Sequence, residues 1–497
     1  MAAEEPAKPV REATEVVPSV RDATVLDPSV AVPESPPRRG PWALFEIFTV
    51  VLVGLLGLIL RLHNDGKAPA FTDNVDELQF TWAGMNMFLH GDAYTWSFYP
   101  PYPNGLVTHG YGDVEFTLVH HWMDHPPLFS LIMGGWALLN GIRDMWTIQP
   151  EQIRTVPVTM SALTVVLVFI LARRLLGFAP AAITAGLLAI APAAILLGRQ
   201  AEPESVQGVL LLACLIFCLY ETEGRGKAWS RGLLLLFCVA APLMKVSGAA
   251  VGGICAVILI ATGSLGLGLA CAGAALGGLG LFALYGWMID WNLFKEIWNT
   301  QAANRTSVMG GFEFLTSSAG ANRQLRDGWW ILGLIGLAML IVVPTTRGDR
   351  RRELFLVWPV FAYSAVMLIM AGEAMAHQYG WYKVIIYPEV YAGAGWLIWE
   401  AVRRSSMALM TLVLVLGGAT ATNWWLGGLD STWVPNPTVL VVLFGIVLAP
   451  AVLVWWGRWR REQVRQVGWV VAGLALAAIA IGNMTESYWL ERIFWRL

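Results

Sequence analysis

The segment TVPVTMSALTVVLVFILA, residues 155–172, indicates the fold class. It contains no charged residue and is followed directly by Arg173 and Arg174. A helix of about 20 apolar residues spans the hydrocarbon core of a bilayer. A pair of arginines directly after such a run is typical of its cytoplasmic end. The segment therefore predicts a transmembrane helix.

The composition of the whole chain agrees with this prediction. Of the 497 residues, 56% are hydrophobic and 14% are charged, whereas soluble domains average about 45–50% and about 25%. This excludes a set of soluble domains, and no basic footprint for nucleic acid is present. The five cysteines lie in apolar runs without metal-ligand spacing or an evident disulfide framework, so we interpret them as packing residues.

Apolar runs recur along the chain and predict an all-α polytopic membrane protein with about 13 transmembrane helices. Two of the runs are short and flank Lys245, which predicts a thinned or partly broken crossing there. The runs lie near residues 43–61, 155–172, 181–198, 206–220, 232–244, 248–262, 266–288, 329–344, 354–371, 384–402, 406–426, 438–456 and 467–482.

The domain organisation and topology follow from the charges. Residues 1–40 are rich in proline and charge, which predicts a disordered cytoplasmic tail before the membrane domain, 41–497. The run 126–140 is too short to span the bilayer, so we expect an interfacial helix that does not cross. With this choice the arginine clusters fall on the cytoplasmic side. The C-terminus and the large loops 62–153 and 290–327 then face outward, and residues 486–497 could form an amphipathic helix.

All seven histidines and several acidic groups fall on the predicted outer face. Asp76 and Glu77 open an expected helix that ends near Gly91. One interpretation is that Asp73 or Asp76 caps this helix and that Glu77 complements its dipole. The other is that one carboxylate accepts a proton from an acceptor hydroxyl.

A second polar group lies in the short turn between two predicted spans. A charged side chain at a bilayer surface costs free energy unless it is solvated or paired, and this turn contains three, Arg199, Glu202 and Glu204. A solvated turn and a second acidic site both remain open.

The third group contains four residues, His120, His121, Asp124 and His125. One helical face would present His121 and His125 to a divalent cation, with Asp124 as a further candidate ligand. Pro126 argues against a helix through this stretch. The alternatives are phosphate contact and ordinary polar loop residues.

Two lysines interrupt or border apolar runs. Lys245 needs an anionic partner or a water-filled cavity, unless its side chain reaches the outer interface. Lys383 follows Trp381 and Tyr382 at the outer end of a span. An aromatic-belt anchor accounts for that second arrangement, and a functional lysine is the alternative.

These segments together resemble a known family. The residues are VDELQFTWAGMNMFLHGD (75–92), HPPLFSLIMGGWALLNG (125–141), RTVPVTMSALTVVLVFILARRLLG (154–177), GRQAEPES (198–205), PLMKVSG (242–248) and QYGWYKVIIYP (378–388). Their order resembles the GT-C glycosyltransferases, especially the bacterial group spanning protein O-mannosyltransferases and aminoarabinose–lipid A transferases. The resemblance is good over about 42–260, weaker to about 400 and slight beyond.

The resemblance implies roles for individual residues. Asp76 matches the catalytic carboxylate and Glu77 a supporting one, while Glu204, with Glu202 beside it, matches a second acidic site. The residues matching the donor-phosphate site are Lys245, His125, Arg199, Lys383 and Tyr382. Gln79 and the His377–Gln378 region depart from the basic residues found in some relatives, which leaves the sugar open.

The resemblance also implies the reaction. A sugar would move from a polyprenyl-phosphate donor to a lipid, glycan or protein acceptor of the cell envelope. In-line displacement would invert the anomeric centre, and a retaining enzyme, with a nucleophilic carboxylate about 5 Å from the sugar, stays open. We expect this on the outer face of a bacterial-type plasma membrane, with no nucleic-acid partner and with a divalent cation as an open question. The alternatives are a transporter or flippase for an envelope lipid or glycan and an inert scaffold of envelope assembly.

Overall fold

The computed structural model describes residues 41–71, 74–305, 314–315, 327–342, 350–370, 380–427, 437–460 and 462–489. The chain divides into two units, Met1–Phe45 and Glu46–Leu497. The elements that position polar side chains all belong to the second unit. The predicted tail 1–40, Asp73, His377 and residues 490–497 of the predicted amphipathic helix lie outside the described residues.

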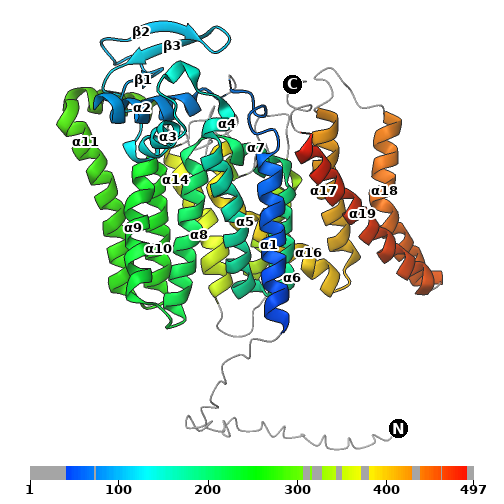
Figure 1. Ribbon diagram of the computed structural model, residues 1–497. Coiled ribbons are helices and arrows are strands. Elements are labelled where there is room, and N and C mark those ends of the chain that lie inside the picture. The colour runs from blue at the N-terminus through cyan, green and yellow to red at the C-terminus, as the bar shows by residue number, and fades with distance from the viewer. Residues whose placement is uncertain are drawn as a thin grey trace, which may run out of the picture. The chain divides into compact units, whose positions relative to one another are not determined.

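The described part of the chain is mostly helical (Figure 1). The long helices of its first half are α1 (Pro41–Leu62), α5 (Thr155–Leu176), α6 (Phe178–Ile190), α7 (Pro192–Arg199), α8 (Pro203–Thr222), α9 (Ala228–Met244), α10 (Ala249–Ala261) and α11 (Leu265–Arg305). Those of its second half are α13 (Gly328–Val342), α14 (Trp358–Met370), α16 (Tyr387–Arg403), α17 (Met407–Gly427), α18 (Pro437–Arg460) and α19 (Glu462–Tyr488). Short helical turns η3 (Val246–Gly248), η4 (Glu353–Val357) and η5 (Gly380–Ile386) precede α10, α14 and α16.

Each of the predicted apolar runs coincides with one of these helices or with a helix pair. Among the described residues, 5 helices are long and apolar enough to cross a membrane, or 6 when the pair α6 and α7, bent by 59°, is taken as one span. The chain is therefore a multi-pass membrane protein, and the number of 13 crossings stays a prediction. The bend lies at Ala191, directly before Pro192, which cannot continue the hydrogen-bond ladder of α6.

The first predicted outer loop contains more than helices. It folds as α2 (Asp76–His90), a three-stranded antiparallel sheet, α3 (Pro127–Leu139), the turn η2 (Met145–Thr147) and the short α4 (Pro150–Ile153). The strands are β1 (Thr95–Trp96), β2 (Leu106–Gly110) and β3 (Val114–Val119), in the order β1-β3-β2. Figure 1 shows the sheet beside α2 at one end of the long helices. The all-α prediction therefore missed this sheet.

The helix predicted from Asp76 to near Gly91 is confirmed. It ends at Gly91, whose φ of 75° is the left-handed conformation that glycine adopts without strain. The predicted helix start at Pro126–Pro127 is also confirmed, because α3 begins at Pro127. The two helices cross closely: a Cβ atom on Gly84 would collide with the backbone of Ser130.

The second large outer loop was predicted over 290–327, and its start is different in the structure. The helix α11 breaks at Asp290, which has extended backbone angles of φ −155° and ψ 101°, and then continues to Arg305. The Asp290 carboxylate accepts hydrogen bonds from the backbone N–H groups of Asn292 and Leu293. It therefore caps a second helical segment where the sequence predicted a loop.

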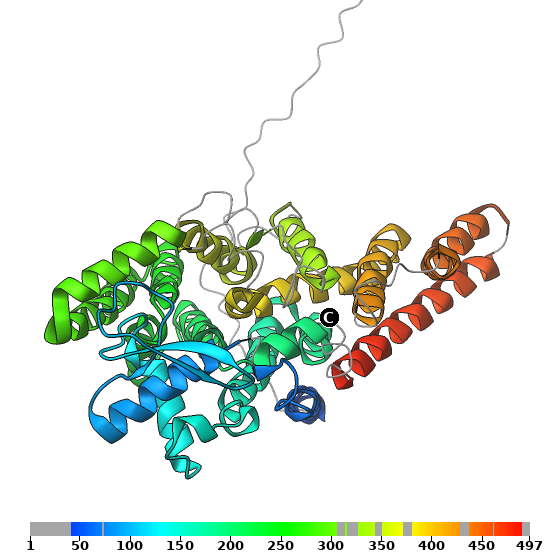
Figure 2. The same ribbon diagram turned by 90° about the horizontal axis from the view of Figure 1, so that it is seen from above.

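At the C-terminal end of the chain, α18 packs against α19 (Figure 2). The close approach depends on Gly468, where a Cβ atom would meet the side chain of Val454. Small residues of this kind let helix backbones approach closely in a membrane.

Candidate functional site

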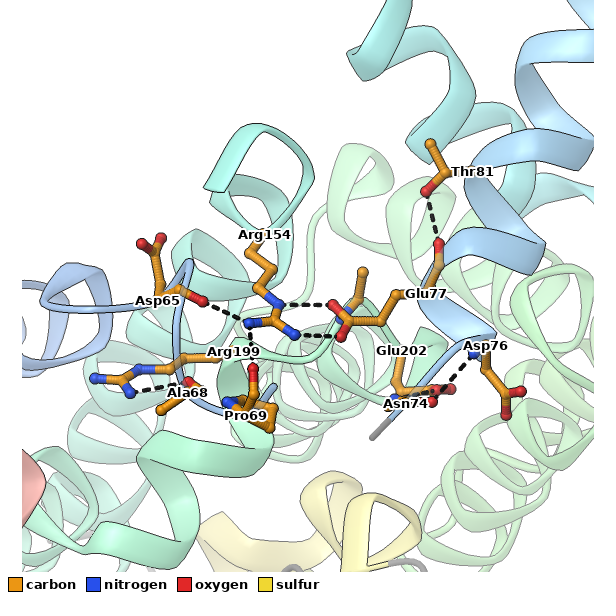
Figure 3. A network of polar contacts seen from close by, with 11 residues as sticks. Asp65, Ala68, Pro69, Asn74, Asp76, Glu77, Thr81, Arg154, Arg199 and Glu202 are labelled. Atoms are coloured by element: carbon orange, nitrogen blue, oxygen red, sulfur yellow. Dashed lines mark hydrogen bonds and ion pairs between the residues drawn. The ribbon is translucent and has the colours of Figure 1, made fainter. Parts of the chain in front are cut away.

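The first turn of α2 sends two adjacent carboxylates in opposite directions. Val75 occupies the N-cap position without a side-chain hydrogen bond, so Asp76 and Glu77 are the first residues of the helix. Asp76 is therefore not the cap, contrary to one interpretation of the sequence, and the other candidate, Asp73, lies outside the described residues. Figure 3 shows Glu77 pointing to Arg154, while Asp76 points away from this pair.

Glu77 is held in place by buried hydrogen bonds from other parts of the protein. Its two oxygens accept hydrogen bonds from Arg154, at 2.8 Å from Nε and 2.5 Å from Nη2, and both side chains are fully buried. The Oε2 atom also accepts from the backbone N–H of Ala201 at 2.9 Å. Arg154 donates in addition to the carbonyls of Asp65 and Pro69. This network joins α2, the chain after α1, the start of α5 and the link between α7 and α8 (Figure 3).

Arg199 also makes its hydrogen bonds within the protein. Its guanidinium donates to four backbone carbonyls, those of Leu60, Arg61, His63 and Ala68, and the side chain is buried. It fixes the end of α1 to the end of α7. The predicted role of Arg199 as a phosphate ligand would require it to give up these bonds.

Two further acidic residues lie beside one lysine. The Nζ atom of Lys245 lies 2.6 Å from Oε1 of Glu204 and 3.9 Å from Oε2 of Glu202. Glu202 accepts a hydrogen bond from the Asn74 amide at 2.9 Å, and the Asn74 oxygen accepts from the backbone N–H of Asp76 at 3.3 Å. We call Asp76, Glu202, Glu204 and Lys245 the carboxylate–lysine cluster.

The local fold explains why these groups meet. Glu202 is the N-cap of α8 and Glu204 lies in its first turn, where negative charge is favoured. Lys245 is the C-cap of α9, with extended backbone angles, at the break predicted from the two short apolar runs. Gln207 of α8 donates to the Lys245 carbonyl at 2.9 Å and so ties this break to α8.

The charges around Glu202 are unbalanced, because two further carboxylates, those of Asp76 and Glu204, and a single cation, Lys245, act on it. The pKa of the Glu202 carboxyl is raised well above its ordinary value, because the group is buried and lies near Asp76 and Glu204. Lys245 and the Asn74 amide act in the opposite direction without cancelling this effect. Glu202 therefore holds a proton over a pH range in which an exposed glutamate is ionised.

Tyr382 of the QYGWYK segment lies against the lysine of this cluster. The Lys245 ammonium lies 4.5 Å from the centroid of the Tyr382 ring, a distance at which the ring attracts a cation. The neighbouring Lys383 is buried and lies over the ring of Trp330, 5.0 Å from its centroid. Because Lys383 is buried, it is not an exposed aromatic-belt anchor. Tyr382 contacts Lys245 of the cluster, whereas the ring contact of Lys383 is with Trp330.

The three predicted metal ligands do not meet. The His121 ring is bonded to Asp92 at 2.9 Å, and His121 has a φ of 58°, so no helix presents it together with His125. Asp124 is buried, and its oxygens accept from the hydroxyls of Ser97 and Tyr102. Within the described ranges, the one group of three or more His, Cys, Asp or Glu ligand atoms close enough to share an ion is Cys214, Cys238 and Cys255.

His125 has an aromatic environment. Its ring lies 5.2 Å from the ring of Phe80 and 5.7 Å from that of Trp122, by their centroids. Its predicted role near a donor phosphate stays a prediction. A divalent cation stays a prediction as well, since the structure gives His121, Asp124 and His125 separate partners.

Two residues of this region were missed at the sequence level. Arg154 could have been noticed as an isolated arginine directly before the span 155–172, where an unpaired charge costs free energy and so needs a partner. Asn74 stands two residues before Asp76 and has no such signal, because its role depends on Glu202, which is distant in the sequence.

One third of the chain matches a known protein family. Residues 124–289 match the family model described as dolichyl-phosphate-mannose-protein mannosyltransferase. This stretch includes Glu202, Glu204 and Lys245. A search of curated protein sequences found no match.

Two solved structures share the fold at low sequence identity. ArnT from Cupriavidus metallidurans, bound to undecaprenyl phosphate, has a TM-score of 0.50 and 16% identity, over 91% of this chain and 77% of that chain. Arabinosyltransferase EmbB from Mycobacterium smegmatis has a TM-score of 0.53 and 13% identity, over 92% of this chain and 42% of that chain. Residues 124–289 are thus similar to this mannosyltransferase family, and the chain shares its fold with ArnT and EmbB.

Proposed function

We propose that this protein is an integral-membrane glycosyltransferase that moves a sugar from a polyprenyl-phosphate donor to an acceptor of the cell envelope. The observation that carries the proposal is the carboxylate–lysine cluster, in which a buried Lys245 and the partly buried Asp76 are held at one end of the helices. The mannosyltransferase family match and the fold shared with undecaprenyl-phosphate-bound ArnT support it.

The proposed reaction is a single displacement at the anomeric carbon. Asp76 accepts the proton of the acceptor hydroxyl while the acceptor oxygen forms a bond to that carbon. The bond between the carbon and the donor phosphate oxygen breaks on the opposite face, so the anomeric configuration inverts. The electron pair of this bond leaves with the polyprenyl phosphate.

Lys245 stabilises the charge that develops on the leaving phosphate. In the structure its ammonium is bonded to Glu204, so a bound phosphate oxygen would share this cation or displace the carboxylate. The proton held by Glu202 removes one negative charge from the cluster, which reduces the repulsion of an anionic donor. Glu77 and Arg199 hold the fold around this site rather than contact the substrate.

The donor leads to a proposed location. Long polyprenyl chains keep the donor in the membrane, so the cluster would receive the phosphate from the leaflet on its side. We assign this side to the outer face of a bacterial-type plasma membrane because the arginine clusters then lie in the cytoplasm. The acceptor is a lipid, glycan or protein of the envelope, and the cluster favours none of them.

Lipid binding tests this proposal directly. The wild-type protein, Lys245→Met and the control Lys295→Met, at an exposed lysine of α11, are purified identically and their bound lipids are identified by mass spectrometry. We expect a polyprenyl phosphate or its sugar conjugate with the wild type and with Lys295→Met, and at least about a ten-fold loss with Lys245→Met. No lipid phosphate on the wild type, even after addition of undecaprenyl phosphate, would overturn the proposal. So would flux of a substrate in sealed vesicles without any glycosyl product.

A further inference from the structure

The five cysteines of the chain meet inside the helical bundle. They lie on four different helices, and all five thiols are free and buried. Cys214 and Cys218 belong to α8, Cys238 to α9, Cys255 to α10 and Cys271 to α11. Figure 1 shows α8, α9 and α10 side by side. The sequence spacing concealed this arrangement, because each helix contributes one or two residues.

Three of the thiols form a compact group. The Sγ atoms of Cys214, Cys238 and Cys255 all lie within 4.8 Å of one another. A metal ion with sulfur ligands at about 2.3 Å in a trigonal plane requires sulfur–sulfur distances of about 4.0 Å. Small movements of these side chains would therefore give a trigonal site. Cys218 lies next to Cys255 and Cys271 next to Cys238, both outside this group of three.

Packing alone does not account for this group. A buried cysteine behaves as a small apolar residue, and alanine or valine can fill the same space in a helix interface. Packing gives no reason for every cysteine of the chain to point to one place from four helices. A shared ligand gives such a reason.

We propose that Cys214, Cys238 and Cys255 form a binding site for a soft, thiophilic metal ion, for which Cu(I) is the appropriate probe. Thiolate sulfur selects ions such as Cu(I) over hard cations. Binding of Cu(I) displaces one proton to solvent and leaves one thiolate and two thiols on the ion. This complex carries no net charge, which suits an apolar bundle interior.

The position of the site gives it a structural consequence. Cys214 lies about 15 Å along α8 from Glu204, and Cys238 about 10 Å along α9 from Lys245. A metal ion here would join α8, α9 and α10 below the carboxylate–lysine cluster without touching it. We expect bound Cu(I) to raise the unfolding temperature of the protein.

The test is a titration of the full chain in nanodiscs under anaerobic, reducing conditions, with Cu(I) buffered by a chromophoric chelator. We compare the wild type with Cys214→Ala, Cys238→Ala and Cys255→Ala, and use Cys271→Ala as the matched control outside the group of three. We expect one Cu(I) per wild-type chain, at least about ten-fold weaker binding in each of the three variants, and little change in the control.

X-ray absorption of the wild-type complex and thermal unfolding in the absence of metal complete the test. We expect three sulfur neighbours at about 2.3 Å around the ion. Sulfur coordination would support the site even if an alanine variant failed to fold. Equal Cu(I) binding by the wild type and the triple alanine variant, or nitrogen and oxygen neighbours around the ion, would overturn the proposal.

Discussion

Glu77 and Arg154 form a doubly hydrogen-bonded ion pair in which neither side chain is exposed to solvent. The pair fixes the first turn of α2 to the start of α5. The family resemblance treats Asp76 and Glu77 as one acidic pair. The structure gives them different surroundings, because Glu77 is bonded to Arg154 while Asp76 points away from this pair.

The first prediction concerns the stability that this pair provides. Glu77→Leu leaves Arg154 charged and buried, so we expect a loss of about 3–5 kcal/mol in the free energy of unfolding. The double variant Glu77→Leu/Arg154→Leu removes both charges and should be more stable than either single variant. Unfolding in mixed micelles, followed by tryptophan fluorescence, gives the double-mutant cycle. A double variant whose loss equals the sum of the single losses would contradict this account.

The second prediction concerns the pH dependence of stability at Glu202. Because the folded state raises the pKa of this carboxyl, the folded protein keeps a proton that the unfolded chain releases above about pH 4.5. The wild type therefore loses stability as the pH rises above this value. Glu202→Gln has no such proton and keeps an oxygen that can accept the hydrogen bond from Asn74.

We thus expect Glu202→Gln to unfold at a higher temperature than the wild type at pH 8 and at a similar temperature at pH 4. Thermal unfolding across this range checks the expectation. A constant difference between the two proteins at all pH values would show that the folded state does not raise this pKa.

The third prediction concerns the crossing of α2 and α3. Gly84→Ala places a methyl group against the backbone of Ser130, so α2 must move, and we expect a loss of about 1–3 kcal/mol in stability. Gly186→Ala in α6 is the matched control, because its Cβ would meet no atom within 4 Å. The higher helix propensity of alanine should leave this control as stable as the wild type or more so. Equal stability of the two variants would argue against the close crossing.

The fourth prediction concerns Lys245 in catalysis. If its ammonium stabilises the leaving phosphate, Lys245→Met should lower kcat by about 10²–10³-fold. Lys245→Arg, which keeps the charge in another geometry, should retain more activity. Steady-state rates with varied donor separate kcat from KM. A change in KM alone would assign Lys245 to donor binding without a role in the transition state.

Much of the fold could be predicted because the bilayer imposes a simple length and hydropathy rule. Apolar runs indicated the helices, Gly91 indicated the end of α2, and Pro127 indicated the start of α3. The sheet of the first loop was missed because β1 has two residues and the exposed residues of β2 show no alternation in the sequence. The helix after Asp290 was missed because its charged and polar residues resemble a loop.

The candidate site was predictable in part. Glu202, Glu204 and Lys245 stood out as charges beside apolar runs, and the structure pairs them. Asp76 stood out at the start of an expected helix, and the structure places it near Glu202. Whether a charged side chain stabilises the fold or stays available for a ligand depends on its partner in space. No local sequence pattern reveals that partner. Arg199 is bound by backbone carbonyls, and Glu77 by an arginine that lies far away in the sequence. The proximity of the cysteines was missed for the same reason, because they lie on four different helices.

The most direct measurement of the central claim is sugar transfer by purified, reconstituted Asp76→Asn. With a radiolabelled polyprenyl-phosphate sugar and envelope extract as acceptor, we expect Asp76→Asn to lose about 10²–10⁴-fold in rate, because no base then accepts the hydroxyl proton. Its unfolding temperature should be that of the wild type or higher, since the side chain points away from the Glu77–Arg154 pair and its charge repels Glu202. Transfer by Asp76→Asn at the wild-type rate would contradict the account.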